Sequence, residues 1–478
     1  MRITKVDVKK WRILESPQAE FRSKCAVIIG ENGSGKSTLI ELIMSVFDIV
    51  YKRLKRPNTP MELDGFCLEY VIKGDDNDDH QVRFESGYDE GSTPGELKIA
   101  IDGEAYNILQ DGGEQIKTLL PANIIAYYAG NTDRIDRICR YYLDENVKAV
   151  RKIDNEFNLL PLNMPSDAPF IYSDLWHMPV ALASLLVTQQ ESRTLEKLNI
   201  REDSVTVNIL LKKPEWARPG SSSEDFWGNS SRLFIDFLGG VIEKSFRKSL
   251  DANRIETEVS IMDLYDFLNE VGIEQKGVFL FQIFDLLYNN GLLDEVDVKW
   301  VRRGDEMNAT PISCKYFSEG EKQVIMTSAL IEFWDKQHCL FLFDEPDTFL
   351  HPKWQSRFLP EVQERLNESQ AIITTHSPLM LSSLSNSSEL FVMKEGKLYY
   401  YGYSTYGADA GDILETAMET TPRDSRVDEL IKDIENDIRI SNFEEAKNKL
   451  SELEDTGISI FDRNRLRSTI EKLELLGV

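Results

Sequence analysis

The sequence predicts an α/β fold whose strands end in phosphate-binding and acidic side chains. A glycine-rich segment, GENGSGKST (30–38), follows the apolar run KCAVIIG and precedes a run with helical spacing. A second apolar run, CLFLF, ends in Asp344 and Glu345, and a third, QAIITT, is followed by His376. Functional groups at the carboxyl ends of such strands are typical of open α/β sheets that bind ligands at that edge.

Composition places the chain among soluble globular proteins. It has 478 residues, which suggests two to three domains, with 41% hydrophobic and 28% charged residues. No apolar run reaches the ~18 residues that a membrane helix needs, so no membrane contact is expected. The N-terminal run MRITKVDVKKWRIL alternates apolar and polar residues, which indicates a first strand rather than a signal peptide. We therefore expect a cytoplasmic protein.

Cysteine spacing and net charge exclude several classes of site. The five cysteines are scattered without a C-x-x-C pair, so they predict neither a zinc site nor a disulfide framework. The formal net charge of −26 disfavours a general nucleic-acid coat, because neutralising phosphates needs a basic surface. Two basic runs, KRLKR (52–56) and TDRIDRICRYY (132–142), leave a local basic face open, although solvated helix faces are their commoner role.

Four segments follow from the pattern of strands, helices and turns. Residues 1–130 read as a first α/β part, with the glycine-rich loop and an antiparallel β lobe whose strands are separated by turn clusters. Residues 131–305 read as a mainly helical insertion with short strands such as VTVNILLK, and without the heptads of a coiled coil. Residues 306–405 return to an α/β pattern, and 406–478 form a charged helical tail.

The glycine-rich segment matches the pattern G-x-x-x-x-G-K-[ST] in its required context of strand before and helix after. Its glycines allow a tight loop whose N–H groups surround phosphate oxygens. Lys36 would place its charge on the β- and γ-phosphates, and the Ser37 hydroxyl would bind Mg²⁺. The predicted nucleotide-binding residues of this loop are Gly30, Glu31, Asn32, Gly33, Ser34, Gly35, Lys36, Ser37 and Thr38.

The two acidic residues after CLFLF suit a magnesium site and a water-activating base. Mg²⁺ prefers one or two carboxylates together with phosphate oxygens, so Asp344 is its expected ligand. Glu345 would orient or deprotonate the attacking water. The alternative is that both residues belong to an acidic turn after a core strand and have no catalytic role. The phosphate loop in the same chain favours the magnesium site over this alternative. His376, at the end of the next strand, would contact the γ-phosphate, although a lone histidine is more often structural.

A polar stretch, FSEGEKQ (317–323), lies before the helical run VIMTSALIEFW. With the phosphate loop, the acidic strand and His376 in this order, the chain resembles ABC-type ATPases of the SMC, RecF and overcoming-lysogenization-defect (OLD) class. FSEGEKQ is similar to their signature motif, with Ser318 and Gly320 at its Ser and second Gly, Glu319 in place of the first Gly and Phe317 in place of Leu. PDTFLHP is similar to their D-loop, which places Asp347 at the D-loop aspartate.

The resemblance implies a mode of action. Two heads clamp two ATP molecules, and each signature motif contacts the nucleotide held by the other subunit's phosphate loop. The differential affinity of ATP for the closed state would drive closure, and hydrolysis would release it. The implied assembly is an ATP-sandwich dimer or a higher homo-oligomer, with ATP and Mg as cofactors and slow ATP hydrolysis as the reaction.

The sequence lacks three features that some members of this ATPase class have. No Q-loop glutamine can be placed after the strand NIIAYYAG, there is no coiled-coil arm, and the residues after His376 lack the strand-end carboxylates of an OLD-type nuclease. Short SMC-like ATPases of this kind resemble the ATPase subunits of bacterial anti-phage systems such as Septu (PtuA-like), which work with a separate HNH nuclease. We therefore expect no intrinsic nuclease, and a nuclease effector as partner.

Other functions stay open at this point. A RecF-like DNA-binding repair clamp predicts a continuous basic surface, which the net charge disfavours. A nucleotide-gated scaffold predicts negligible turnover, although Lys36, Asp344, Glu345 and His376 make hydrolysis chemically possible. An OLD-type nuclease-associated ATPase, or a nuclease within this chain, is the weakest option.

Overall fold

The computed structural model describes residues 1–61, 63–89, 93–128, 133–150, 169–173, 175–189, 195–196, 198–306, 309–335, 338–420, 424–453 and 456–476. Its contacts divide the chain into two compact units, Met1–Tyr406 and Gly407–Val478. The boundary predicted between residues 130 and 131 lies outside the described residues. The other boundaries predicted within the first unit stay predictions.

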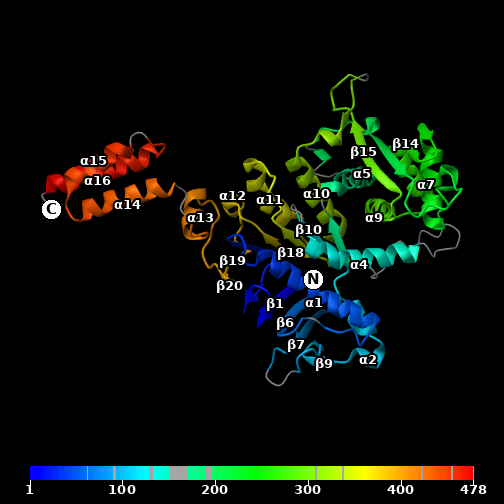
Figure 1. The fold of residues 1–478 in the computed structure, drawn as a ribbon, viewed down its shortest axis with the longest axis horizontal. Coiled ribbons are helices and arrows are strands. Elements are labelled where there is room, and N and C mark those ends of the chain that lie inside the picture. Colours follow the sequence, from blue (N-terminus) through cyan, green and yellow to red (C-terminus); the bar gives the residue numbers. More distant parts are fainter. Residues whose placement is uncertain are drawn as a thin grey trace. The chain divides into compact units, whose positions relative to one another are not determined.

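A seven-stranded sheet forms the centre of the first unit (Figure 1). Its order is β11-β10-β17-β18-β5-β19-β20, and all neighbours are parallel except β19 and β20. The order places β17, β18 and β5 side by side, so their carboxyl ends meet at one edge. The strands are β5 Cys25–Gly30, β10 Ile124–Tyr128, β11 Phe170–Ser173, β17 Leu340–Asp344, β18 Gln370–Thr374, β19 Glu389–Lys394 and β20 Lys397–Tyr400.

Every residue of β17 and β18 is buried, which explains why their sequences are continuous apolar runs rather than alternating ones. The helix after the phosphate loop, α1, covers Lys36–Lys55 and also buries most of its residues. Three further helices belong to this α/β part and contact one another in chain order. They are α10 Glu319–Trp334, α11 Pro352–Arg365 and α12 Pro378–Leu381.

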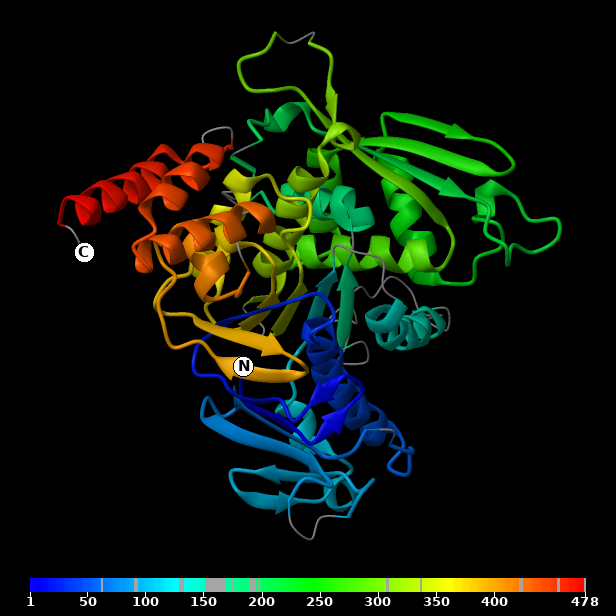
Figure 2. The same ribbon diagram turned by 60° about the vertical axis from the view of Figure 1, so that its left-hand side comes forward.

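The predicted β lobe is a six-stranded antiparallel sheet of order β4-β1-β6-β7-β8-β9, drawn in blue to cyan in Figure 2. Side chains from this sheet and from α1 share one hydrophobic core, so the lobe packs directly on the helix that follows the phosphate loop. The lobe's strands are β1 Arg2–Val8, β4 Gln18–Glu20, β6 Phe66–Lys73, β7 Asp79–Ser86, β8 Lys98–Ile101 and β9 Glu104–Tyr106. Smaller elements nearby are β2 Lys10–Trp11, β3 Leu14–Glu15, α2 Ile108–Asp111 and α3 Glu114–Thr118.

The insertion holds more β structure than the predicted short strands implied. Alternating burial in β12 (Thr206–Lys212) marks one face of a five-stranded antiparallel sheet of order β13-β14-β12-β15-β16. Helix α5 of the insertion contacts α10, which joins the insertion to the head. The other strands are β13 Arg247–Leu250, β14 Arg254–Ser260, β15 Leu293–Trp300 and β16 Ile312–Ser313. The helices are α4 Asp133–Val150, α5 Met178–Val187, α7 Arg232–Lys244, α8 Ile261–Glu270 and α9 Lys276–Asn289.

The second unit is helical and has its own small core. Its amphipathic helices bury residues such as Ile434, Leu453 and Ile470 against one another. The helices are α13 Ala410–Thr416, α14 Ser425–Arg439, α15 Phe443–Glu452 and α16 Ile460–Leu476. Among the described residues of the whole chain, no helix combines the length and the apolar character that crossing a bilayer requires.

Candidate nucleotide site

The phosphate loop connects the end of β5 to the start of α1, as predicted. Gly35 has φ +118°, and a Cβ there would lie 2.9 Å from the Leu14 side chain, so only glycine fits. A Cβ on Gly30 would clash with the carbonyl oxygen of Met393. The Ser34 hydroxyl is buried without a hydrogen-bond partner among the described residues, which leaves a polar group for a phosphate. Within the loop, Thr38 is buried, whereas Glu31, Asn32, Gly33 and Ser37 are exposed.

Lys36 lies inside the loop that it was predicted to serve. Its Nζ donates to the carbonyl oxygens of Gly30 (3.1 Å) and Glu31 (3.2 Å) and lies 2.6 Å from Nε2 of His376. Burial lowers the pKa of Lys36, and the carboxylates of Glu345, Asp344 and Asp347 oppose that effect. The ammonium group is thus held among acceptors by the loop itself, where a phosphate would be its strongest partner.

Asp344 ends β17 and is fully buried. The Thr374 hydroxyl donates to its Oδ1, while Oδ2 has no hydrogen-bond partner among the described residues. Burial raises the pKa of Asp344, and hydrogen bonds from Ser37 and Thr374 oppose that rise. A buried, unpartnered carboxylate oxygen beside the Ser37 hydroxyl fits a magnesium ion, which would neutralise phosphate charge. Among the described residues, no three acidic, His or Cys side chains are arranged so that they could hold a metal ion by themselves, so phosphate oxygens and water would complete the shell.

Glu345 has an unusual backbone conformation. Its φ of +49° lies in the left-handed region, which non-glycine residues rarely adopt. Its N–H donates to both the carbonyl oxygen (3.1 Å) and the hydroxyl (3.0 Å) of Thr374, which hold the strained turn. The hydrogen bond to His376 is the largest effect on Glu345 and lowers its pKa. The carboxylate is therefore ionised and available to orient water.

His376 links Lys36 and Glu345 through a single atom. Nε2 lies 2.6 Å from Lys36 Nζ and 3.3 Å from Glu345 Oε1. Nε2 accepts from Lys36 only in a tautomer that leaves this nitrogen without a hydrogen, and it donates to Glu345 only when it carries one, so the two hydrogen bonds exclude each other. A phosphate that engages Lys36 would compete for the first contact. His376 thus contacts both of the other predicted catalytic residues, although the three follow three separate strands.

Asp347 lies in the loop after β17 and is buried. Burial raises its pKa to about 6, and a hydrogen bond with Thr375 opposes that rise. A Cβ on Gly320 would lie 2.9 Å from the carbonyl oxygen of Phe349, so the start of α10 packs tightly on the same loop. The signature-like segment and the D-loop-like segment therefore meet within one chain.

Ser318 caps α10 and forms a capping box with Glu321. The Ser318 N–H and hydroxyl donate to Glu321 Oε2 at 2.9 and 2.7 Å, and the Glu321 N–H donates to Ser318 Oγ at 3.3 Å. Beside it, Tyr316 is 87% exposed, while the Phe317 ring packs 5.3 Å from Trp300. The hydrogen bonds of Ser318 thus stay within the first turn of its own helix, whose remaining N–H groups point outward from the helix end.

Two positioning residues were not predicted. Thr374 holds both acidic residues of the site, and it pairs with Asp344 in the parallel register of β17 and β18. Gln355 on α11 accepts from the Ser377 hydroxyl (2.9 Å) and donates to the carbonyl oxygens of Asp347 (3.3 Å) and Leu350 (3.1 Å). The signal for Thr374 was a hydroxyl at a strand end, but its partner strand is known only from the sheet order.

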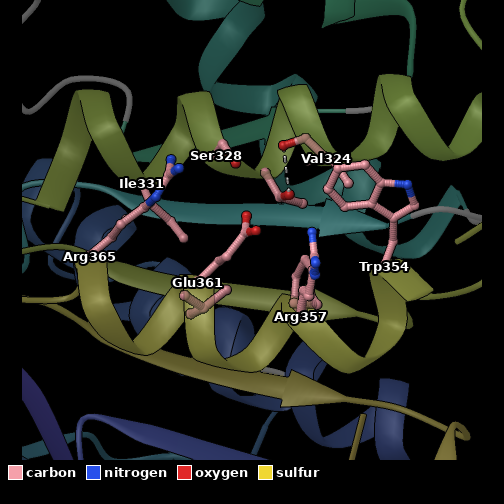
Figure 3. Close-up of a pocket in the computed structure, with 10 residues that line it drawn as sticks. Val324, Ser328, Ile331, Trp354, Arg357, Glu361 and Arg365 are labelled. Carbon is pink, nitrogen blue, oxygen red and sulfur yellow. Dashed lines mark hydrogen bonds between the residues drawn. The ribbon is translucent and has the colours of Figure 1, made fainter. Parts of the chain in front are cut away.

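A small cleft between α10 and α11 carries several charged side chains (Figure 3). Arg357, Glu361 and Arg365 project from α11 toward α10, and Arg365 lies 3.9 Å from Glu332 of α10. Thr327 of α10 turns its hydroxyl back to the helix and donates to the carbonyl oxygens of Gln323 (2.9 Å) and Val324 (3.3 Å). These contacts help to fix the signature-bearing helix relative to the helix after the D-loop.

Comparison with known sequences agrees with this geometry. Residues 5–168 match the family model described as "AAA domain", and residues 241–382 match the model described as "AAA domain, putative AbiEii toxin, Type IV TA system". "Retron Vc95 probable ATPase" of Vibrio cholerae serotype O1 biovar El Tor is 21% identical over 459 residues, covering 88% of this chain and 78% of the relative. The chain resembles SMC/RecF-like and defence-system ATPases.

Two further relatives match over shorter regions. "Retron Ec83 probable ATPase" of Escherichia coli is 31% identical over 84 residues, covering 18% of this chain and 15% of the relative. "DNA replication and repair protein RecF" of Leptospira biflexa serovar Patoc is 23% identical over 208 residues, covering 41% of this chain and 55% of the relative. Among solved structures, the "SMC head domain from Thermotoga maritima" matches with 14% identity and a TM-score of 0.36, covering 84% of this chain and 98% of that chain.

Proposed function

We propose that the chain binds and hydrolyses ATP with Mg²⁺, assembles with copies of itself around the nucleotide, and controls a separate effector. The observation that carries this proposal is the contact of Lys36, His376 and Glu345 at the shared edge of three parallel strands. Asp344 supplies an unpartnered carboxylate oxygen at the same edge. Together these groups can bind phosphate, hold a cation and orient water.

Self-assembly is supported by the signature-like segment. Helix α10 begins after its N-cap, Ser318, and its first N–H groups are available to a ligand. Gly320, in the first turn, lies close to the loop around Phe349. A helix start of this kind suits an anion. In our proposal that anion is the γ-phosphate of an ATP held by another copy of the chain.

A role in anti-phage defence is supported by the retron relatives and by the architecture of the chain. The similarity to "Retron Vc95 probable ATPase" spans most of both proteins. The effector in this proposal is a nuclease encoded separately, of the HNH type found with Septu (PtuA-like) ATPases. The insertion and the helical tail would provide surfaces for partners.

The test is a Glu345→Gln variant of the full chain. Removing the base should lower ATP turnover by ~10³-fold while leaving ATP binding intact, because the phosphate loop and Asp344 are unchanged. The ATP-bound assembly should then persist, which analytical ultracentrifugation with and without ATP can measure. Glu361→Gln on α11 is a matched control away from the three strand ends. A Glu345→Gln protein that neither retains ATP nor changes assembly would contradict the proposal.

A second candidate function, DNA binding, is favoured by one further feature. A large groove runs along α1 and α4, and residues from both basic runs, 52–56 and 132–142, line it. Its lining includes the basic residues Arg12, Lys52, Arg53, Lys55, Arg56 and Arg137 against the acidic residues Glu41, Asp48 and Glu145. The groove is thus locally basic in a chain whose net charge is −26.

Two cations of the groove also lie over aromatic rings. The Arg12 guanidinium lies 4.3 Å from the Trp11 ring, and the Lys52 ammonium lies 5.0 Å from the Tyr141 ring. Both cations also pair with carboxylates, Arg12 with Glu41 (2.5 Å) and Lys52 with Asp48 (2.7 Å). Cations beside aromatic faces are a common arrangement for nucleic-acid strands.

Fluorescence anisotropy with a labelled oligonucleotide tests this candidate. Reversing the charges of Arg56 and Arg137 should weaken binding at least tenfold and reduce its salt dependence, because fewer counterions are released. Lys397→Glu, on an exposed position of β20, is the control for net charge. Equal binding by the groove variant and the control would assign any DNA affinity to another surface.

A further inference from the structure

Strand β10 places a tyrosine beside the two acidic residues of the site. It runs parallel to β17, with Tyr127 opposite Phe343 and Tyr128 opposite Asp344. Register partners on neighbouring strands send their side chains to the same face of a sheet. Tyr128 should therefore leave the sheet on the side from which the Asp344 carboxylate meets Ser37 of the phosphate loop.

Ring contacts on the opposite face support this assignment. The rings of Tyr127 and Phe343 lie 6.3 Å apart at 85°, and both side chains are fully buried. Because successive side chains alternate between faces, this pair leaves Tyr128 and Asp344 together on the nucleotide side. Tyr128 is only partly buried, as expected for a group at the mouth of a site.

Electrostatics give an independent sign of proximity. Burial is the largest cause of the raised pKa of Tyr128, and the carboxylates of Asp344 and Glu345 raise it further. A phenol with a raised pKa keeps its proton at neutral pH, so its hydroxyl can donate one hydrogen bond and accept another. No hydrogen bond of this hydroxyl occurs among the described residues, and the next four residues lie outside them.

We propose that the Tyr128 hydroxyl hydrogen-bonds the attacking water and positions it beside Glu345 during ATP hydrolysis. In this step the water oxygen bonds to the γ-phosphorus, and the bond from the γ-phosphorus to the β,γ-bridging oxygen breaks. The ADP oxygen takes that electron pair, and Glu345 accepts the proton that the water loses. Tyr128 keeps its own proton and acts by orientation alone. This inference rests on the proposed ATP hydrolysis and adds a residue to it.

Tyr128→Phe in the full chain tests the inference, because it removes one hydroxyl and keeps the ring. We expect kcat for ATP to fall at least tenfold while KM for ATP stays within about twofold, since the phosphate contacts remain. The melting temperature should stay unchanged, which separates water positioning from a structural role. Tyr399→Phe removes the hydroxyl of an exposed tyrosine on β20 and should leave kcat unchanged.

The outcomes distinguish this inference from the proposed function. If the wild-type chain hydrolyses ATP and Tyr128→Phe has the same kcat, the inference is overturned and the proposed function stands. If kcat and KM change together with a lower melting temperature, the tyrosine is structural and the inference is overturned. If the purified wild-type chain does not hydrolyse ATP, both are overturned.

Discussion

The phosphate-loop half and the signature-like half of the head are built in different ways. At the phosphate loop, His376 contacts both Lys36 and Glu345, and Thr374 hydrogen-bonds to Asp344 and Glu345. At the start of α10, the hydrogen bonds of Ser318 among the described residues lie within the first turn of its own helix, and the neighbouring Tyr316 is 87% exposed. The first half is organised for a ligand by contacts within the chain, whereas the second presents its groups outward.

This difference has a physical consequence for activity. Strand ends in one sheet position their side chains rigidly, so we expect the first half to bind nucleotide in a single chain. An outward-facing helix start contributes only when another surface brings an anion to it. The comparison therefore predicts that defects in the two halves separate ATP binding from ATP-driven assembly.

Among three further variants that test this comparison, Ser318→Arg should have the largest effect. The bulky cation should block the approach of a second nucleotide-bearing chain, so ATP-driven assembly is lost and turnover falls by ~100-fold or more. ATP binding by the single chain should remain, because no contact of the phosphate loop changes. Sedimentation and equilibrium ATP binding measure the two properties separately.

Glu321→Ala controls for the helix cap, whose loss costs about 1 kcal/mol by itself. It removes the acidic partner of Ser318 without adding bulk. Should the Ser318→Arg protein still assemble and hydrolyse ATP like the wild type, the distinction between the two halves would be wrong.

A pH-dependent effect is expected at Asp347, which lies in the loop that contacts both halves. Its pKa is raised to about 6 from an ordinary 3.8, so the folded protein binds this proton more tightly than the unfolded chain. The associated stability is fully present below pH ~4 and is lost as the pH rises through ~6. A shift of about two units corresponds to about 3 kcal/mol.

Asp347→Asn removes this titration. Relative to the wild type, the variant should therefore gain melting temperature as the pH rises from 5 to 7.5. Asp409→Asn, at an exposed helix cap in the second unit, is the control for a change of one charge. A pH-independent difference between Asp347→Asn and the wild type would show that burial of this carboxylate is not the cause.

The smallest of the three effects is expected for Thr374→Val. The substitution keeps the shape of the side chain but removes a hydroxyl that donates to Asp344 and accepts from the Glu345 N–H. Leaving a buried carboxylate oxygen without its donor costs about 2 kcal/mol, and kcat should fall together with the melting temperature. Thr374→Ser retains the hydroxyl and should behave like the wild type. Equal melting temperatures for Thr374→Val and Thr374→Ser would show that the Thr374 hydroxyl does not stabilise the two acidic residues.

Several parts of this architecture could be predicted from local patterns. The phosphate loop, the acidic strand end and the strand before His376 all lie where the sequence placed them, because each depends on a short run of neighbouring residues. The antiparallel lobe and the strands β19 and β20 also follow from alternation and turn residues. The sheet of the insertion was only partly predicted, because its strands pair over long distances in the chain.

Other features required the folded chain. Thr374 and Gln355 act on residues about 30 and 8 positions away, and their own segments do not show which residues those are. The basic groove combines runs that are some 80 residues apart, on α1 and α4. The capping box of Ser318 and Glu321 differs from these features, because its S-x-x-E spacing is visible in the sequence and predicts the start of a helix without the folded chain.

By itself, the sequence determined the candidates for binding phosphate, holding a cation and activating water, because those chemical roles depend on residue type and on short spacing. Only the tertiary structure decided which of these residues meet. The order of strands β17, β18 and β5 brings His376 into contact with both Lys36 and Glu345, whereas Ser318, at the start of α10, is exposed. Strand order arises from pairing across hundreds of residues, and local sequence does not encode it.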